Sequence, residues 1–126
     1  MSEKRPMKYL LMIYENEKAF ESLPEADVQR VMGEYATFTE ALHSSGNFVA
    51  GEELEPTTAA TTVRIRDGKR LTTDGPFAET REQLGGFFLV EARDLDEAIG
   101  IASRIPSARH GSIEVRPVRE FTPPEA

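Results

Sequence analysis

The chain of 126 residues contains no cysteine and no tryptophan. Without a thiol it can form neither a disulfide framework nor a cysteine nucleophile, and it offers no cysteine ligands to a metal. Histidine is also scarce, because only His43 and His110 are present and no HxxxH or HxH spacing occurs. The sequence therefore predicts neither a metal site nor a bound cofactor.

Long hydrophobic runs are missing as well. The apolar run within MKYLLMIY spans about seven residues, which is too short for a membrane span or a convincing signal segment. It is followed at once by ENEKAFE, which offers no small-residue cleavage site. We therefore expect a cytoplasmic protein without a membrane partner.

Positive charge is in the minority, with 15 Lys and Arg against 22 Asp and Glu and a net charge of −7. No cluster of Lys and Arg is longer than two residues, so the basic face that neutralises nucleic-acid phosphates is not expected. Hydrophobic residues make up 39% of the chain, below the usual share of a globular protein. The length fits one domain over residues 1–126, and the modest apolar content favours support from a partner subunit.

Two segments have helical spacing. The first is predicted over about residues 23–45, with Ser22 as its cap and Glu25 in the capping-box position. Asp94 and Glu97 repeat this capping pattern before a second helix, which ends near residue 104 because Pro106 stops it. The apolar stripes are Val28, Val31, Met32, Tyr35, Phe38 and Leu42 in the first helix, and Leu95, Ala98, Ile99, Ala102 and Ile105 in the second.

Strand patterns fill the remaining segments. Residues 7–14 read as a central strand, and residues 119–126 as a loose tail. Asp67-Gly68 is typical of a tight hairpin turn between two short strands. The other strands are expected at residues 47–54, 61–66, 69–73, 86–92 and 112–118.

The order of elements predicts an α+β fold, a ferredoxin-like βαββαβ domain with an inserted β-hairpin. Two helices on one face of an antiparallel sheet leave the other face without cover. Packing of this face against the same face of a second copy supplies that cover. We therefore expect a homodimer.

Several stretches together carry a family resemblance: MKYLLMIY, GEELEP, ATTVRIRDGK, TDGPFAETREQLGGFFLVEARDLDEAIGIASRIP and GSIEVRPV. The chain resembles the DGPF-type branch of the YCII-related family over nearly its whole length. The resemblance implies a dimeric α/β barrel and a small bacterial cytoplasmic protein, in some cases linked to an extracytoplasmic-function sigma factor. It implies no established reaction.

Better-studied members of the wider family resemble enzymes with a proposed His–Asp pair. The histidine lies on the first helix and the aspartate in an Asp-Pro pair after the second. Here Tyr35 stands at the helix position, and Ile105-Pro106 replaces Asp-Pro. The His–Asp mechanism is therefore not carried over to this chain.

The DGPF loop at residues 74–77 has two interpretations. In the first, the Asp74 carboxylate accepts a hydrogen bond from the backbone N–H of Phe77 and only shapes a turn. In the second, Asp74 is an acid or base that lines the mouth of the barrel. Arg81, between Glu79 and Glu82, forms a solvated ion pair or anchors an anionic group of a substrate.

Tyr35 and His110 complete the candidate catalytic residues. Tyr35 fits a core position with a satisfied hydroxyl, and His110 a surface loop, but both could also reach a cleft. One hypothesis is a cofactor-free enzyme that acts on a small organic molecule. The alternative is a non-catalytic ligand-binding or regulatory module, with a sigma factor as its partner.

Overall fold

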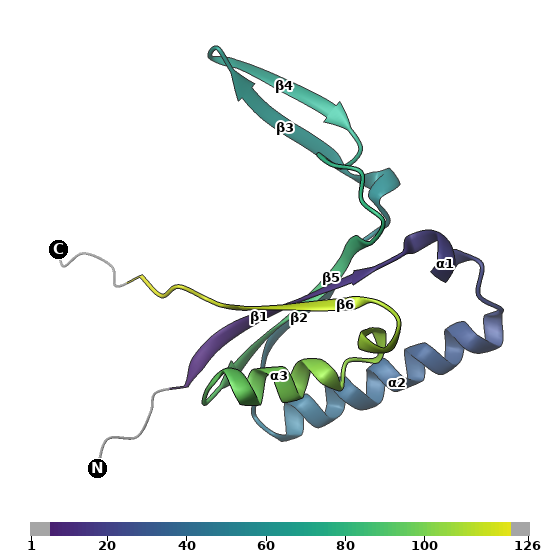
Figure 1. Cartoon of the computed structure of the whole chain (residues 1–126), viewed down its shortest axis with the longest axis vertical. Coiled ribbons are helices and arrows are strands. Elements are labelled where there is room, and N and C mark those ends of the chain that lie inside the picture. The colour runs from purple at the N-terminus through teal and green to yellow at the C-terminus, as the bar shows by residue number, and fades with distance from the viewer. Residues whose placement is uncertain (1–5, 122–126) are drawn as a thin grey trace.

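The structure is a computed structural model that describes residues 6–121. Four antiparallel strands form one sheet in the order β2-β5-β1-β6. Figure 1 shows α2 and α3 together on one side of this sheet. This is the strand order of the ferredoxin-like motif, so the predicted fold class is confirmed. The bounds are Met7–Glu15 for β1, Glu25–Ser44 for α2, Phe48–Glu53 for β2, Gln83–Ala92 for β5, Leu95–Ser103 for α3 and Ser112–Pro117 for β6.

The core lies between the sheet and the two helices. Alternate side chains of the central strands point toward the helices and are buried, as the period of two in a strand requires. The ring of Phe38 on α2 meets that of Phe88 on β5 edge to face, with centroids 5.2 Å apart. The buried cluster comprises Tyr9, Leu11, Ile13, Phe38, Leu42, Phe88, Val90, Ala92, Ala98, Ile101, Ala102 and Ile105.

The first helical segment begins differently from its prediction. A short helix, α1 (Glu17–Glu21), precedes it, and Asn16 caps α1 by accepting backbone N–H groups. The Ser22 hydroxyl donates to the carbonyl of Ala19 at the end of α1. The N-cap of α2 is Pro24, which makes no side-chain cap bond. The prediction that Ser22 caps the long helix is therefore wrong, because its hydroxyl is used by the preceding turn.

The second long helix follows its capping prediction but only part of its predicted stripe. The Asp94 carboxylate accepts from the backbone N–H of Glu97, which confirms the N-cap. Leu95 and Ile99 are 49% and 48% exposed, whereas Ile101 is 1% exposed. The buried face of α3 is thus rotated from the predicted one.

The outer face of the sheet is apolar at its centre. On this face Leu10 lies opposite Leu89, and Met12 lies opposite Phe87. All four side chains are only partly buried. No helix among the described residues covers them in Figure 1. β1 is central as predicted, but it is fully buried on one face only, and the cover by a second copy stays a prediction.

The inserted hairpin forms a separate two-stranded sheet of β3 (Thr61–Arg66) and β4 (Lys69–Asp74). Its turn has positive φ at Asp67 (52°) and Gly68 (74°), as a two-residue hairpin turn requires. Residues 61–74 are called the arm below. Figure 1 shows the arm projecting from the domain on the side away from the helices.

Hydrogen bonds hold the root of the arm. The backbone N–H of Gly75 donates to the carbonyl of Ala60 at 2.7 Å, and the Thr62 hydroxyl donates to the carbonyl of Gly75 at 2.8 Å. The carboxylate of Glu17 accepts from both the N–H and the hydroxyl of Thr57, which begins the short 3-10 helix η1 (Thr57–Ala59). The first two bonds join the two limbs of the arm at its base, and the Glu17–Thr57 bonds tie the segment before it to the domain.

The two remaining expectations concern the C-terminal tail and the membrane. Residues 119–121 follow β6 without regular structure, and the rest of the predicted loose tail lies outside the described residues. No helix in the described part of the chain has the length and apolar character that a membrane crossing needs.

Candidate functional site

A cavity of about 660 Å³ lies between α2 and the edge of the sheet that β2 and β5 form. Its floor includes Phe88 and Gly86, and its opposite wall includes Met32, whose side chain is 64% exposed. Apolar walls with a few polar groups are typical of a small-molecule site. This cavity is called the cleft below.

The cleft is rich in carboxylates. Glu15, Glu17, Glu21, Glu52, Glu53 and Glu55 line it, and among the lining residues there is no Lys or Arg. Two of these carboxylates already have partners, because Glu17 binds Thr57 at the root of the arm and Glu15 lies 3.1 Å from Nε2 of His110. The others give the cleft a negative character, which favours ligands with positive or hydrogen-bond-donating groups.

A pair of hydroxyls joins α2 to the turn after α3. The Tyr35 hydroxyl lies 2.5 Å from Oγ of Ser107, and Ser107 has no exposed surface. Burial raises the pKa of the Tyr35 phenol above its usual 10.0, and the negative charges of Glu15 and Glu53 raise it further, against the opposing effect of the Ser107 hydrogen bond. Tyr35 is therefore a neutral hydrogen-bonding group at neutral pH, placed in the wall of the cleft.

A second polar pair lies at the end of β1. Nε2 of His110 is 3.1 Å from the Glu15 carboxylate, which also lines the cleft. The His110 side chain is 52% exposed and that of Glu15 is 23% exposed. The imidazole therefore remains accessible to solvent while its orientation is set by a carboxylate.

Gly111 allows the Tyr35–Ser107 and His110–Glu15 pairs to form side by side at the end of β1. Its backbone N–H donates to the carbonyl of Ser107 at 2.7 Å. A Cβ atom at this position would collide with the carbonyl oxygen of Tyr14. Only glycine permits this approach, which brings the turn that carries Ser107 and His110 against the end of β1.

The four predicted site residues fall into two groups. Tyr35 lies in the cleft wall, and His110 contacts the cleft through Glu15. Asp74 and Arg81 are exposed and lie outside the residues that line the cleft. The structure thus brings Tyr35 and His110 to one end of the domain and leaves the other two outside it. The catalytic roles of all four stay predictions.

The environment of Asp74 is simple. It ends β4 and pairs with Thr61 across the arm. The following Gly75 has φ of 97°, as expected for a glycine that turns the chain. Within the part of the chain that the structure describes, the Asp74 carboxylate accepts no hydrogen bond, so the expected bond from the N–H of Phe77 is not formed. Its lone pairs face solvent.

Arg81 makes no ion pair with its neighbours among residues 6–121. The carboxylate of Glu82 accepts instead from the hydroxyl of Ser112 at 2.8 Å. The expected solvated ion pair of Arg81 is therefore absent in this arrangement.

Two residues of the site were missed at the sequence level. Ser107 directly follows Pro106, in the segment where the family pattern places Asp-Pro, and this proximity was an available signal. Glu15 had no such signal, because its role depends on the pairing of β1 with β6. In that pairing Tyr14 lies opposite Ser112, which places Glu15 next to the His110 turn.

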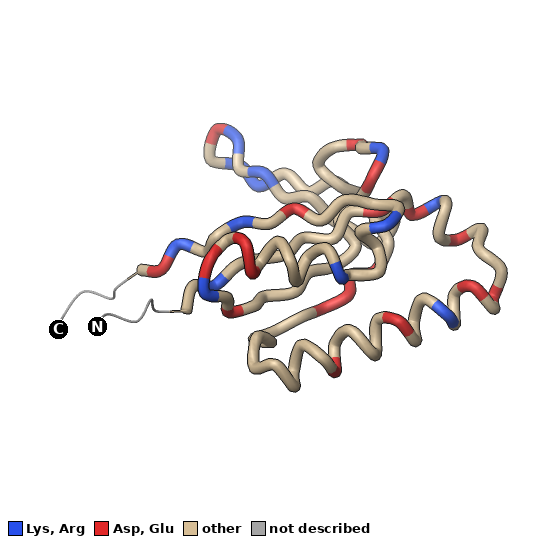
Figure 2. The backbone as a smooth tube through the Cα atoms, turned by 60° about the horizontal axis from the view of Figure 1, so that its bottom comes forward, with Lys and Arg blue, Asp and Glu red and all other residues tan. Residues whose placement is uncertain are grey.

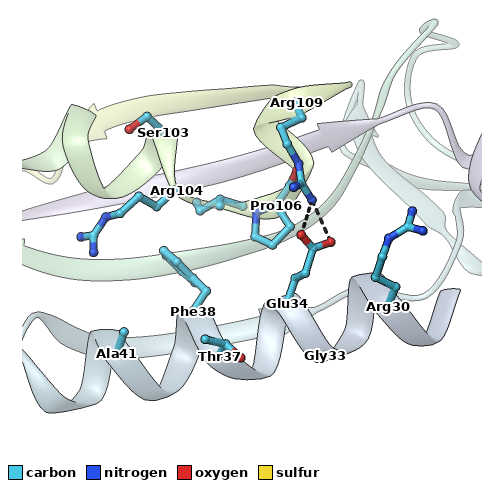
Figure 3. Close-up of a pocket in the computed structure, with 11 residues that line it drawn as sticks. Arg30, Gly33, Glu34, Thr37, Phe38, Ala41, Ser103, Arg104, Pro106 and Arg109 are labelled. Atoms are coloured by element: carbon cyan, nitrogen blue, oxygen red, sulfur yellow. Dashed lines mark hydrogen bonds and ion pairs between the residues drawn. The ribbon is translucent and has the colours of Figure 1, made fainter. Parts of the chain in front are cut away.

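A second groove of about 770 Å³ runs between α2 and the 3-10 helix η2 (Pro106–Arg109). Figure 3 shows Glu34 and Arg109 bridging it, with both carboxylate oxygens 2.8 Å from the guanidinium. Arg30 is held by Asp27 at 2.7 Å. Because these charges already have partners, the groove offers a ligand less than the cleft does.

Metal ligands do not converge in the described region. Across residues 6–121, no group of three or more His, Asp or Glu side chains is placed to hold a metal ion.

Comparison with known proteins gives two matches. The YCII-related domain matches residues 7–122. An uncharacterized protein of Rhizobium meliloti (strain 1021) is 36% identical over 121 residues, which cover 94% of this chain and 98% of that protein. Both matches extend over the whole ferredoxin-like domain, including the arm and the cleft.

Proposed function

The chain belongs to the YCII-related family, and from this premise we propose that its cleft binds a small organic molecule and acts on it without a cofactor. The observation that carries the proposal is the Tyr35 hydroxyl in the wall of an acidic cavity, held from behind by the buried hydroxyl of Ser107. Buried polar groups that converge on a concave apolar site are typical of ligand binding. We assign the chain to the DGPF-type branch on the motif at residues 74–77.

The chemistry proposed for this site is proton transfer. The neutral phenol of Tyr35 donates a hydrogen bond to an oxygen of the ligand, while Ser107 holds the ring in place. His110, oriented by Glu15, gives or takes the proton. The carboxylates favour a ligand with an amine or several hydrogen-bond donors, and the apolar wall takes its carbon skeleton.

The alternative is a non-catalytic ligand-binding or regulatory module that acts with an extracytoplasmic-function sigma factor. The missing His–Asp pair favours this alternative, because Tyr35 and Ile105-Pro106 stand where the better-studied members of the wider family have these two residues. Both functions require the same ligand in the same cleft. They differ in whether the bound molecule is chemically changed, which analysis of the recovered ligand decides.

We also propose that the protein is a cytoplasmic homodimer, joined through the apolar outer face of the sheet. The partial exposure of Leu10, Met12, Phe87 and Leu89 supports this, since a contiguous apolar sheet face favours burial. The predicted roles of Asp74 as an acid or base and of Arg81 as an anion anchor depend on this second copy. Both residues lie outside their own cleft.

A thermal-shift screen of small amines, acids and neutral metabolite-like compounds tests the ligand site. Compounds that stabilise the wild type are titrated by calorimetry against Tyr35→Phe, Asp74→Asn and the control Glu34→Gln, which lies in the other groove. We expect Tyr35→Phe to weaken binding about tenfold, the value of one lost hydrogen bond, and Glu34→Gln to bind as the wild type does.

Equal affinities of the wild type and Tyr35→Phe for every compound would overturn the assignment of the cleft. An unchanged affinity of Asp74→Asn would remove Asp74 from any ligand role. Loss of binding in Glu34→Gln alone would move the site to the groove between α2 and η2.

A further inference from the structure

The two faces of the arm differ in character. Strand pairing places Arg64 opposite Leu71 and Arg66 opposite Lys69 on one face, the basic face of the arm. Val63 and Ile65 belong to the other face and are 57% and 59% exposed. The arm thus presents Arg64, Arg66 and Lys69 beside Leu71 on one side, and Val63 and Ile65 beside the single cation Arg70 on the other.

An exposed arm of this kind requires a partner surface. An isolated two-stranded hairpin is only marginally stable in water, and neither face of the arm packs on the four-stranded sheet. Its root is nevertheless held by Glu17 on Thr57 and by Thr62 on Gly75. Each strand has six residues, which corresponds to a reach of about 20 Å. A projecting hairpin with exposed apolar side chains on one face is typical of a segment that contacts another protein surface.

The cations of the arm form no ion pair with the described part of their own subunit. The arm carries four cations and two carboxylates, although the whole chain carries 15 cations and 22 carboxylates. None of the ion pairs found among residues 6–121 involves a cation of the arm. Figure 2 shows these cations gathered on the arm, apart from the body of the domain.

The complementary charges lie at the mouth of the cleft. Glu52, Glu53 and Glu55 are exposed at the end of β2 and just beyond it, and none of them joins an ion pair in the described part of the chain. Glu52 lies opposite Phe87 on the open face of the sheet, and Glu53 lies opposite Gly86 on the other face, so the carboxylates surround the edge of β2. Leu54 between them is 43% exposed. This edge therefore combines unpaired negative charge with an apolar side chain, as the arm combines positive charge with apolar side chains.

We propose that the arm of one subunit docks on a second copy of the chain, with its basic face over Glu52, Glu53 and Glu55 of the partner subunit. The arm projects from the open side of the sheet, away from its own helices, so a copy that covers this open face is the surface it meets (Figure 1). Each cleft is then closed by the arm of the other subunit and is incomplete in a monomer. The inference rests on the homodimer of the proposed function.

Absence of cysteine allows a direct cross-linking test. Protein with Arg66→Cys is mixed with size-tagged protein carrying Glu53→Cys, or Asp96→Cys on the exposed surface of α3 as a control, and the mixture is oxidised mildly. We expect the disulfide between the tagged and untagged chains to form at least tenfold faster with Glu53→Cys than with Asp96→Cys. Equal rates, or a disulfide that closes only within one chain carrying both Arg66→Cys and Glu53→Cys, would overturn the proposal.

Charge reversal tests the same contact without a cross-link. Arg64→Glu with Arg66→Glu, and separately Glu52→Lys with Glu53→Lys, are each expected to raise the dimer dissociation constant about tenfold at low salt. Mixing the two variants restores association, because each reversed arm then meets a reversed cleft edge. Identical dissociation constants in all four preparations would contradict the docking.

Light scattering, combined with the cross-link, separates the homodimer from the docking of the arm. A species of 14.0 kDa at micromolar concentration would refute the homodimer and the docked arm together. A dimer without the cross-link between positions 66 and 53 would refute the docking of the arm but not the homodimer. The basic face of the arm would then bind a different acidic partner. Calorimetry measures ligand binding at Tyr35 separately, so failure of the docked arm is distinguishable from failure of the proposed ligand site.

Discussion

The Tyr35 hydroxyl lies 2.5 Å from the Ser107 hydroxyl and links two elements that are 72 positions apart in the chain. Ser107 is fully buried, so Tyr35 is the partner that satisfies its hydroxyl. This contact closes the helix layer over the sheet at the same place where the cleft opens. Loss of this one hydrogen bond should therefore affect both the stability of the fold and the geometry of the site.

A double-mutant cycle measures this bond. Tyr35→Phe leaves a buried hydroxyl unpaired and should lower the free energy of unfolding by about 1–2 kcal/mol. Ser107→Ala should cost about 1 kcal/mol, because the Tyr35 hydroxyl can still be solvated from the cleft. We expect a coupling of about 1 kcal/mol from urea denaturation of the single and double variants. Strictly additive effects would show that the two hydroxyls do not stabilise one another.

Stability should depend on pH through Tyr35. The pKa of Tyr35 is raised above 10.0, chiefly by burial, so the folded state holds the phenol proton more tightly than the unfolded state does. The resulting stability is complete below pH 10 and is lost as the pH rises through the folded pKa. The difference in unfolding free energy between the wild type and Tyr35→Phe should therefore be constant below pH 10 and shrink above it. A difference that grows in alkaline solution would contradict this sign.

Substitution of Gly111 should damage the fold and the site together. Gly111→Ala places a Cβ against the carbonyl oxygen of Tyr14, and we expect a loss of at least about 2 kcal/mol of stability. Gly100→Ala is the matched control, since nothing lies within 4 Å of its added Cβ on the exposed side of α3. The control should gain about 0.5–1 kcal/mol, because alanine favours a helix. Equal thermal midpoints of the two variants would disprove the tight approach at Gly111.

The root of the arm should loosen when Glu17 is changed. Glu17→Gln weakens the paired hydrogen bonds to Thr57, so amide hydrogens of residues 57–75 should exchange faster while those of β1 and β5 keep their rates. Glu21→Gln is the control, because Glu21 also lines the cleft but makes no hydrogen bond to the arm root in the described residues. Equal amide exchange rates at residues 57–75 in the two variants would show that Glu17 does not hold the arm.

The order of strands and helices along the chain and the hairpin could be predicted from the sequence because their signals are local. Alternation of apolar residues marks the strands, Asp67-Gly68 marks the turn, and Asp94 marks a helix start. Ser22 misled the prediction because a serine hydroxyl can cap a following helix or close a preceding turn, and here it closes α1. Local sequence does not decide between these two uses.

The candidate site was harder to predict because its contacts are distant in sequence. Glu15 and His110 meet only through the register of β1 with β6, and Ser107 reaches Tyr35 only after α3 has packed. For Asp74 the sequence left two roles open, a turn residue or a group at the mouth of a barrel, and the side chain is exposed on β4, which pairs only with β3. Where a projecting element points depends on packing at its root, which no spacing pattern records.

The central claim is that the cleft beside Tyr35 is the ligand site. It is tested most directly by backbone amide chemical-shift mapping with a compound that stabilises the wild type. We expect the shifts to cluster on residues 15–17, 35, 52–55 and 107–111, and the affinity for the compound to be about tenfold lower in Tyr35→Phe. Shifts confined to the groove between Glu34 and Arg109, or to the arm alone, would contradict it.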